Sequence, residues 1–398
     1  MSRPASTRAS LIFLAVTLLG FLAASSAPTP LYHLYQEHMQ FSPAILTLIF
    51  GVYAFSLLAA LLTVGSLSDY LGRKPVIFVA LLLNMLAMLL FINAESIGWL
   101  IGARLIQGFA TGMATSVLGA ALLDFDRQQG PLITSVAPML GMACGALGCG
   151  LLAEFAPLPL QLTYWLLLGL FLGEAVYLWH LGESVSPQPG AWRSLRPTLH
   201  VPVQARRALW LTLPLNLAAW AVGGFYLSLA PSLVRTATGS SSNLIGGALV
   251  AVLTLSGALS IYTLRNQAAG TILRWAGALL VIGLVLVLSA AHRGSLPLFF
   301  IGTLVTGSGF GAGFLGALRS IVPLALPHER AGLMSAFYVL SYLAFSLPSL
   351  LAGNLVRVFG LIPTTDGYGA VLIVLSVVAL WGAMRQPQSV VMKTGDRL

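Results

Sequence analysis

The sequence predicts an all-α membrane protein whose twelve transmembrane helices form two pseudo-symmetric bundles of six. Three observations lead to this prediction: the scarcity of charge, the number of long apolar runs and the one-sided distribution of basic residues. Only 8% of the 398 residues are Asp, Glu, Lys or Arg, and 58% are hydrophobic. Soluble proteins carry about 25% charged residues. Most of the surface of this chain must therefore face lipid.

Twelve apolar runs are each long enough to cross a bilayer, which takes about 20 residues of helix. They cover residues 10–32, 42–65, 75–94, 97–121, 131–153, 162–181, 208–233, 244–264, 272–291, 296–319, 330–356 and 367–385. Short polar turns separate the runs, except for one longer gap whose prolines, glycine and arginines predict a hydrated linker. We therefore expect an N-terminal six-helix bundle over 1–181, the linker over 182–207 and a C-terminal six-helix bundle over 208–398.

The basic residues fall mostly on one side of the predicted membrane. With the N-terminus inside, sixteen of the 20 Lys and Arg lie in cytoplasmic segments and three lie in outer loops. Basic residues concentrate in the cytoplasmic loops of membrane proteins. The count therefore predicts cytoplasmic termini and a cytoplasmic linker. We expect the membrane to be a bacterial inner membrane. Because the basic residues are spread between apolar runs, the net charge of +9 does not indicate nucleic-acid binding.

The first span begins like a signal peptide, with a basic segment, an apolar stretch at residues 11–23 and the small-residue sequence AASSA. Its removal would leave eleven spans and break the division into six and six, so we expect it to be retained. The polar sequence SSAPTP also suits a broken helix beside a cavity, where irregular backbone is tolerated.

The loop between spans 2 and 3, GSLSDYLGRK, concentrates charge in an apolar chain. Its carboxylate lies one turn from two basic residues, and a carboxylate at this depth is costly unless it is paired. One glycine permits a tight turn, and the other lets two helices approach closely. The residues that form this pattern are Gly65, Asp69, Gly72, Arg73 and Lys74.

This loop resembles the signature loop of the major facilitator superfamily, in sequence and in its position after span 2. Tyr70 stands where a basic residue is usual. The resemblance implies the major facilitator fold, and a charged latch of Asp69 and Arg73 that holds the two halves together when the cytoplasmic side is closed. The alternative is that Arg73 and Lys74 only anchor the loop at the membrane surface.

A polar stripe runs along span 4 in the sequence RLIQGFATG. Its polar and small residues, from Arg104 to Thr115, fall within an arc of about 140° on a helix. The stripe resembles the second motif of the same superfamily: an arginine, two residues, a glutamine and a glycine. An arginine inside the membrane is a functional-site hypothesis by default. The alternative is a structural ion pair or a side chain that reaches the membrane surface.

Span 5 contains Pro138 followed by several glycines, which resembles the glycine-rich motif of the antiporter members. Ala146 stands where those members have a proline. The glycines also explain close helix packing by themselves. This motif therefore favours export only modestly.

Polar and aromatic side chains recur on spans that the resemblance places around a central cavity, where such transporters bind their substrates. Rings with a few hydroxyl groups suit an amphipathic ligand better than a sugar, although a lone tyrosine also fits an interfacial belt. The candidate substrate or coupling residues are Arg104, Gln107, Thr111, Ser25, Ser26, Tyr32, Asn216, Trp220, Tyr226, Tyr338 and Tyr342.

Span 1 contains no Asp or Glu, whereas many proton-coupled exporters of this superfamily keep an acidic residue there. Two other residues are therefore the candidate proton carriers. Glu174 is the carboxylate well inside a span, and His33 near the outer end of span 1 titrates near neutral pH in its ordinary state. The alternatives are packing or snorkelling for Glu174 and an interfacial position for His33.

Enzymatic and cofactor motifs are missing from the sequence. The segment GAGFLG, Gly311 to Gly316, fits a dinucleotide fingerprint, but it lies inside a span with no strand before it. Cys144 and Cys149 have neither a redox nor a zinc spacing. We therefore expect no cofactor, no metal and no enzymatic activity, and any uphill transport must use an ion gradient.

These observations together predict a monomeric secondary transporter in the lipid bilayer. We expect it to move small, amphipathic molecules by alternating access, with protons as the coupling ion and efflux as the direction. The alternatives are a proton-coupled uptake symporter and, with less support from the sequence, a membrane-embedded enzyme or a non-transporting sensor.

Overall fold

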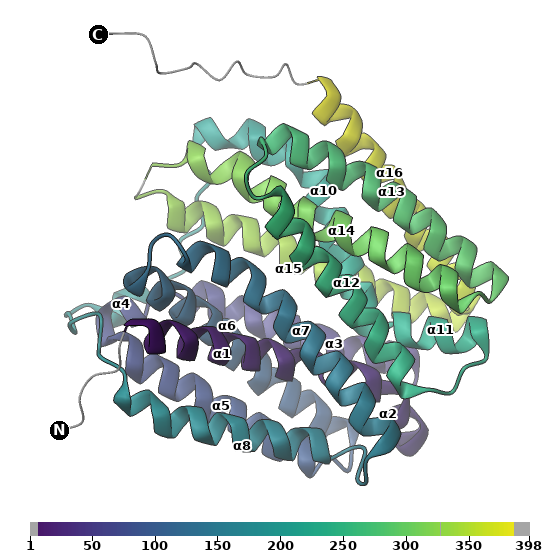
Figure 1. Ribbon diagram of the computed structural model, residues 1–398, viewed down its shortest axis with the longest axis horizontal. Helices are drawn as coiled ribbons and strands as arrows, with labels where there is room; N and C mark the ends of the chain where they lie inside the picture. The colour runs from purple at the N-terminus through teal and green to yellow at the C-terminus, as the bar shows by residue number, and fades with distance from the viewer. Residues whose placement is uncertain (1–6, 327, 386–398) are drawn as a thin grey trace.

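A computed structural model describes residues 7–326 and 328–385. This part of the chain consists of helices and their connections, and it contains no strand (Figure 1). Twelve of its helices are long and apolar enough to cross a membrane. The predicted all-α class and the predicted number of spans are therefore confirmed.

The first six long helices lie together and are coloured purple to teal in Figure 1. They are named the N-group here and comprise α1 (Thr7–Ser26), α3 (Pro43–Thr63), α5 (Arg73–Ile92), α6 (Ile97–Phe125), α7 (Gly130–Phe155) and α8 (Leu162–Tyr177). The last six are named the C-group and comprise α10 (Val203–Ser228), α12 (Asn243–Leu264), α13 (Ala269–Arg293), α14 (Leu296–Ile321), α15 (Arg330–Phe359) and α16 (Leu361–Arg385).

Short helices lie in the connections between these long ones. The short α-helices are α2 (Tyr32–Met39), α4 (Ser68–Leu71), α9 (Ala191–Ser194) and α11 (Ala230–Thr238), and the 3-10 turns are η1 (Thr29–Leu31), η2 (Leu178–His180) and η3 (Val322–Leu324). The helix α9 belongs to the segment between the two groups, which runs past the loop between α3 and α5. There the backbone N–H of Gln188 donates to the carbonyl oxygen of Tyr70 at 2.8 Å.

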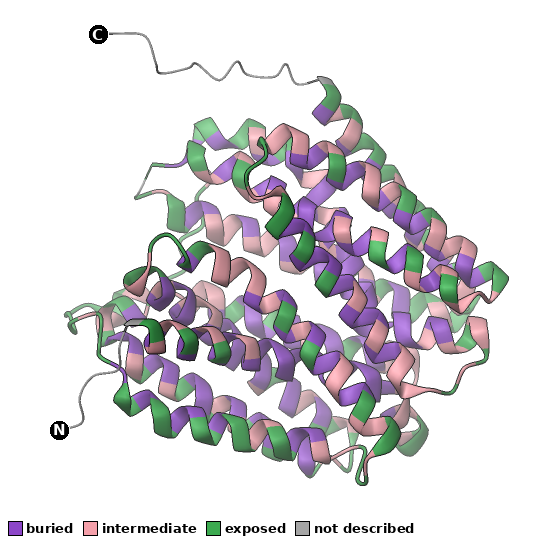
Figure 2. Ribbon diagram, in the orientation of Figure 1, coloured by how far each residue is buried: buried purple, intermediate pink, exposed green. Residues whose placement is uncertain are grey.

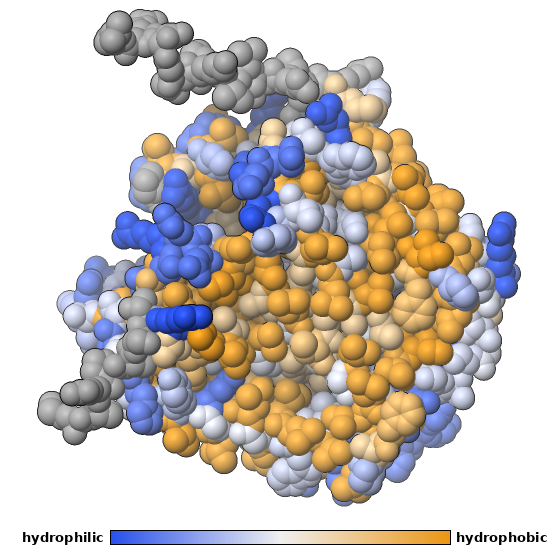
Figure 3. Space-filling view, in the orientation of Figure 1, coloured by the Kyte–Doolittle hydropathy of each residue, from blue (hydrophilic) through white to orange (hydrophobic). Residues whose placement is uncertain are grey.

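The outer surface of the bundle is apolar. Large side chains such as Trp210 and Leu351 are 71% and 65% exposed. Buried and exposed residues alternate around most of the helices, and exposed residues are frequent in the connections (Figure 2). Apolar residues cover most of the face seen in Figure 3, and hydrophilic ones gather toward the helix ends. Such a surface is stable in lipid and would be an aggregation liability in water.

The first span is broken, as the sequence SSAPTP predicts. Helix α1 ends at Ser26, and η1 and α2 continue the path. Pro28 and Pro30 lie in this break. Because proline has no backbone N–H, it cannot donate the hydrogen bond that would continue α1.

The seventh span is also broken, although the sequence pattern predicts one apolar run over 208–233. Helix α10 ends at Ser228 and α11 begins at Ala230. Pro231 lies in the first turn of α11, a position that proline favours at a helix start but not in a helix interior. The apolar composition therefore continues across a point where the helix does not.

The two groups meet along two helix pairs, α7 with α12 and α3 with α15. Small residues allow the close approach. A Cβ added to Gly247 of α12 would overlap the carbonyl oxygen of Ala146 of α7, and one added to Gly353 of α15 would overlap the side chain of Thr47 of α3. Both contacts lie in the half of the bundle where α1 and α10 end.

Candidate functional site

A cavity of about 240 Å³ lies between the N-group and the C-group. Its walls come from α1, α3, α6, α7, α10, α12, α14 and α15. The resemblance places spans 1, 4, 7 and 10 around the cavity and spans 2, 5, 8 and 11 beside them, and these are the same eight helices. Among the described lining residues, Arg104 is the one charged side chain. The volume is below the range of about 300–1,000 Å³ usual for drug-sized ligands, so this arrangement suits a small ligand.

The cavity reaches toward one end of the bundle. Its lining includes Leu61 near the end of α3 and Thr134 and Ser135 near the start of α7. These residues lie at the same end as Asp69, because α3 leads into the loop that carries it. This end is named the Asp69 end.

The opposite end, named the Glu37 end, is bridged by contacts between the two groups. The hydroxyl of Thr29 donates to the carbonyl oxygen of Leu227 at 3.0 Å. The backbone N–H of Asn243 donates to the carboxylate of Glu154 at 2.7 Å. An ion pair joins Arg235 and Glu37 at 3.5 Å, which adds to the bridging at this end.

Arg104 lies in α6 and is 1% exposed. Its Nη1 donates to the carbonyl oxygen of Ser25 at 2.8 Å and to Oε1 of Gln107 at 2.7 Å. Its Nε and Nη2 both donate to the hydroxyl of Tyr32, with the Nε bond at 3.1 Å. The ring centroid of Tyr53 lies 4.8 Å from the guanidinium carbon. All these partners are uncharged, and no carboxylate of the described chain forms an ion pair with Arg104.

Arg104 also explains how the break after α1 is stabilised. The last carbonyl groups of a helix lack partners within the helix. Nη1 of Arg104 donates to the carbonyl oxygen of Ser25, and Nε2 of Gln107 donates to the carbonyl oxygen of Ala24 at 2.9 Å. A helix C-terminus carries about half a negative charge, so it offsets part of the charge of the guanidinium and leaves the rest uncompensated.

Aromatic rings from α10, α14 and α15, all in the C-group, form the wall across the cavity from the N-group. The ring of Trp220 lies 4.9 Å from Tyr342, 6.0 Å from Phe345 and 6.2 Å from Phe314, centroid to centroid. The indole Nε1 of Trp220 is buried and has no hydrogen-bond acceptor. Indole nitrogen is a donor only, so this buried donor of the wall residue Trp220 is left without a partner.

The structure brings five of the eleven candidate substrate residues to the cavity wall. These are Ser25, Arg104, Trp220, Tyr338 and Tyr342. Gln107 and Tyr32 lie behind the wall as partners of Arg104. Thr111 donates to the backbone of Gln107, and therefore belongs to the same helix turn.

The other three candidates make contacts elsewhere. Ser26 donates to the carbonyl of Met142 at 2.9 Å and joins α1 to α7. Asn216 donates to the hydroxyl of Ser341 at 2.9 Å. The hydroxyl of Tyr226 shares a hydrogen bond with Thr303 at 2.8 Å, inside the C-group. These three side chains hold helices together, and none lines the cavity described here.

Sequence reasoning missed several lining residues. Tyr53 and Phe50 of α3, Phe310 and Phe314 of α14 and Phe345 of α15 all line the cavity. They lie in apolar runs where aromatic residues also face lipid, so composition does not distinguish them. The helical spacing of Phe50 and Tyr53 with Leu57 and Leu61, all on one face of α3, is the signal that was available.

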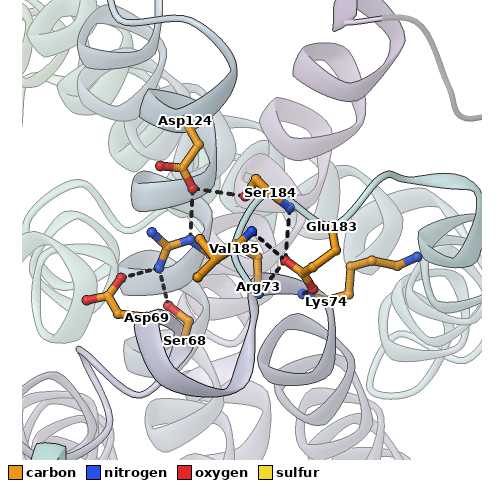
Figure 4. Close-up of polar contacts among 8 residues, drawn as sticks. All are labelled: Ser68, Asp69, Arg73, Lys74, Asp124, Glu183, Ser184 and Val185. Atoms are coloured by element: carbon orange, nitrogen blue, oxygen red, sulfur yellow. Dashed lines mark hydrogen bonds and ion pairs between the residues drawn. The ribbon is translucent and has the colours of Figure 1, made fainter. Parts of the chain in front are cut away.

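A second cluster lies at the Asp69 end around Arg73 (Figure 4). The guanidinium donates from Nη1 to Asp69 at 2.5 Å and to the hydroxyl of Ser68 at 2.7 Å. Its Nε donates to Asp124, at the end of α6, at 2.9 Å. The side chain of Arg73 is 10% exposed, whereas those of Asp69 and Asp124 are 55% and 31% exposed. Arg73 is therefore held inside a cluster of three acceptors.

Glu183, directly after the sixth span, completes this cluster. Its carboxylate accepts the backbone N–H groups of Arg73 at 2.8 Å and Lys74 at 3.0 Å, the first two residues of α5. An acidic group at a helix N-terminus satisfies unpaired donors and favours the helix dipole. Gly72 has φ +93°, and a Cβ there would lie 2.9 Å from Glu183. The position requires glycine.

The remaining predicted loop residues lie around the same cluster. Nζ of Lys74 donates to the carbonyl of Leu181 at 2.7 Å and lies over the ring of Trp179. A Cβ on Gly65 would overlap the carbonyl of Leu61 in its own turn. Sequence reasoning missed Asp124 and Glu183. Both are acidic residues at span ends in a chain with only 11 Asp and Glu, and that scarcity was the available signal.

The two candidate proton carriers lie far apart along the bundle. Glu174 of α8 is 5% exposed, and neither of its carboxylate oxygens has a hydrogen-bond partner. It faces α1, since a Cβ added to Gly20 would lie 3.4 Å from its Oε1. His33 lies at the Glu37 end beside Arg235 and Asn243.

A larger groove of about 730 Å³ lies between α10, α15 and α16. Its lining carries no Asp, Glu, Lys, Arg or His, and includes the exposed side chains Leu351, Phe359 and Val371. The groove therefore opens away from the interface of the two groups, on the lipid-facing surface.

Comparison with known proteins places the chain in a family. Residues 12–348 match the Major Facilitator Superfamily. The multidrug resistance protein MdtL of Citrobacter koseri is 26% identical over 313 residues, 74% of this chain and 75% of the relative. MdtL of Klebsiella pneumoniae is 32% identical over 114 residues, 27% of this chain and 29% of the relative.

Solved structures share the fold. The nucleoside transporter NupG superposes with a TM-score of 0.73 at 13% identity, over 95% of this chain and all of that one. A bacterial homologue of the human lysosomal transporter Spinster, inward-facing and unoccupied, gives 0.73 at 14% identity, over 96% and 98%. The human organic anion transporter MFSD10 gives 0.68 at 21% identity, over 94% and 100%. The chain therefore belongs to the major facilitator superfamily and is an integral, multi-pass membrane transporter of small molecules, not an enzyme.

Proposed function

We propose that this transporter exports small amphipathic molecules by alternating access, driven by protons that move inward. The observation that carries the proposal is a central cavity between two helix groups, which hydrogen bonds and an ion pair of the described residues bridge at the Glu37 end. Such a cavity can change the side on which it opens if the groups rock against each other. The glycine-rich α7 and the likeness to MdtL multidrug resistance proteins support export, and the cavity volume supports a small substrate.

In this proposal the Asp69 end faces the cytoplasm of a bacterial cell, and both termini lie on that side. The sixteen Lys and Arg on this side of the chain, against three on the other, support the orientation. The described arrangement is then inward-facing. Residues 1–181 and 208–398 act as two six-helix domains, joined by the linker 182–207.

The cluster around Arg73 is the proposed latch. Asp69 is more than half exposed, and no ion pair of the described residues joins it to the C-group. We expect Asp69 and Arg73 to contact the C-group when the Asp69 end closes, with Gly65, Gly72 and Lys74 shaping the loop. Asp124 and Glu183 hold Arg73 in place meanwhile.

Glu174 is the proposed proton carrier. An ionised carboxylate without a partner is costly in a buried site, so gain or loss of a proton changes the packing of α8 against α1. The contacts on either side of Glu174 join the same helices: Phe21 with Phe171 and Phe13 with Tyr177. Helix α1 also carries Leu18, Leu22 and Ser25 of the cavity wall. Protonation is thereby coupled to the cavity through one helix.

Transport in inverted membrane vesicles tests the proposal. Small aromatic compounds of positive, negative and zero charge are offered outside the vesicles, with an acidic or a neutral lumen. We expect at least one compound to accumulate in the acidic lumen and to be lost when nigericin collapses the pH gradient. Accumulation that is equal in the acidic and the neutral lumen, or larger in the neutral one, contradicts proton-driven export.

The role of Glu174 is tested by Glu174→Gln, with Glu95→Gln at an exposed loop position as the matched control. We expect Glu174→Gln to abolish gradient-driven accumulation while exchange of labelled for unlabelled compound continues. Gradient-driven accumulation that equals the control removes Glu174 from the coupling step.

A further inference from the structure

We infer that the cavity binds organic anions, with the negative group of the ligand at Arg104 and its apolar part against the aromatic wall. The inference rests on the proposed function in that it takes the central cavity as the substrate site. It goes further because it specifies the charge of the ligand. Composition and the MdtL relatives leave that charge open, and the likeness to the organic anion transporter MFSD10, at 21% identity, concerns the fold alone.

The charge balance of the cavity carries the inference. Arg104 is the one charged residue among the described lining residues, and its acceptors are two neutral side chains and a backbone carbonyl. A buried charge without an opposite charge is costly, and a partner of opposite sign removes much of that cost. The half charge at the C-terminus of α1 offsets only part of it. An anionic ligand completes the compensation, whereas a cationic ligand adds to the cost.

The polar groups on the opposite wall of the cavity also favour an anionic ligand. Trp220 offers a buried N–H without an acceptor. The lining contains no Asp, Glu or His, so it presents no carboxylate or imidazole to attract a cation. A buried donor without an acceptor costs about 1–3 kcal/mol. A sulfonate, carboxylate or phosphate group has several acceptor oxygens, and one of them can supply the acceptor that the Trp220 N–H lacks.

The other residues of the wall determine which apolar part of a ligand the cavity accepts. Phe50, Phe310, Phe314, Tyr342 and Phe345 surround the space with aromatic faces and edges. Ring stacking is directional and adds to apolar burial. With about 240 Å³ available, the ligand class is a small aromatic or aliphatic body that carries one anionic group.

Three probes of nearly equal shape test the inference: 1-naphthalenesulfonate, the neutral 1-naphthalenesulfonamide and 1-naphthylmethylammonium. Binding to the full chain in lipid nanodiscs is measured by calorimetry, with empty nanodiscs as the blank. We expect the sulfonate to bind at least about tenfold more tightly than the other two, as a charge-assisted hydrogen bond allows. Equal affinities, tighter binding of the ammonium, or no binding of any probe would overturn the inference.

Two variants test whether Arg104 and Trp220 cause the preference for the sulfonate. Arg104→Gln should reduce the ratio of sulfonate to sulfonamide affinity to about one, whereas the exposed control Arg293→Gln should keep it. Because Arg104 also holds the end of α1, Arg104→Gln must first show a wild-type thermal unfolding curve. If it does not fold, Trp220→Phe decides: it keeps the ring, removes the N–H and should weaken sulfonate binding several-fold without weakening the ammonium. A preference that survives these variants contradicts the inference.

Failure of this inference and failure of the transport proposal give different results. Sulfonate binding without gradient-driven flux contradicts export and leaves the anion site standing. Gradient-driven flux of the ammonium, without preferential sulfonate binding, contradicts the anion site and leaves export standing.

Discussion

The two ends of the bundle are held in different ways. At the Glu37 end the N-group and the C-group touch directly, through close contacts of Gly247 with the Ala146 backbone and of Gly353 with the Thr47 side chain, and through a few polar bridges. At the Asp69 end the ion pairs of the described residues stay within the N-group, around Arg73. Packing therefore joins the two groups at the Glu37 end, whereas the ion pairs at the Asp69 end connect residues of the N-group with one another. An interface built from packing and exposed pairs can separate without stranding a buried charge.

Gly247→Val should give the largest effect, because it attacks the packed end. A side chain there would overlap the carbonyl of Ala146, and overpacking of this kind costs about 1–3 kcal/mol. We expect a lower thermal unfolding midpoint and at least a tenfold loss of transport. Gly148→Val is the matched control on α7, since a Cβ at Gly148 meets nothing within 4 Å. Equal behaviour of the two variants would show that the contact of α7 with α12 is not what joins the groups.

Gly72→Ala tests the organisation of the Asp69 end. The backbone of Gly72, at φ +93° and ψ 159°, lies in a region of backbone angles that residues other than glycine rarely adopt. We expect a loss of stability of about 1–3 kcal/mol, measured by thermal unfolding. Gly102→Ala, where a Cβ meets nothing within 4 Å, should leave stability unchanged or raise it slightly. A wild-type midpoint for Gly72→Ala contradicts the strained turn.

Asp124→Asn and Asp69→Asn separate stability from function. Asp124 is the less exposed partner of Arg73 and also accepts from Ser184, so we expect its loss to cost about 1 kcal/mol and that of Asp69 less. The latch nevertheless predicts that Asp69→Asn lowers transport several-fold, with normal insertion in the membrane. Unchanged flux in Asp69→Asn contradicts the latch.

Glu37→Gln should have the smallest effect. The ion pair with Arg235 spans 3.5 Å between side chains that are 66% and 26% exposed. Exposed pairs contribute about 0–1 kcal/mol. We expect unfolding and flux to match the wild type closely. A loss as large as that of Gly247→Val would mean that charge, not packing, holds the Glu37 end.

The parts of the fold that depend on composition could be predicted from sequence. Twelve spans follow from hydropathy, and the break after α1 follows from the prolines in SSAPTP. The break at Leu229 was missed because the apolar run continues through it, and only Pro231 marks it. Hydropathy indicates which residues lie in the membrane, whereas backbone hydrogen bonds determine where a helix ends.

The candidate site was less predictable. Arg104 could be singled out because charge inside a span is rare, and its partner Gln107 lies on the same helix face. Its other partners, Tyr32 and the carbonyl of Ser25, come from the break after α1, which packing of α1 against α6 brings close. Asp124 and Glu183 lie 51 and 110 residues from Arg73 in the chain. The scarcity of acidic residues could single out Asp124 and Glu183, but one sequence does not show that either contacts Arg73.

Paired distance measurements at the two ends test the alternating movement most directly. Spin labels replace Gln128 and Gln267 at the Asp69 end, and Glu95 and Ser241 at the Glu37 end, in a chain without Cys144 and Cys149. As pH and ligand are varied, we predict that the distance at the Asp69 end shortens while the distance at the Glu37 end lengthens. Distances that stay fixed, or that change in the same direction at both ends, would contradict alternating access in this protein.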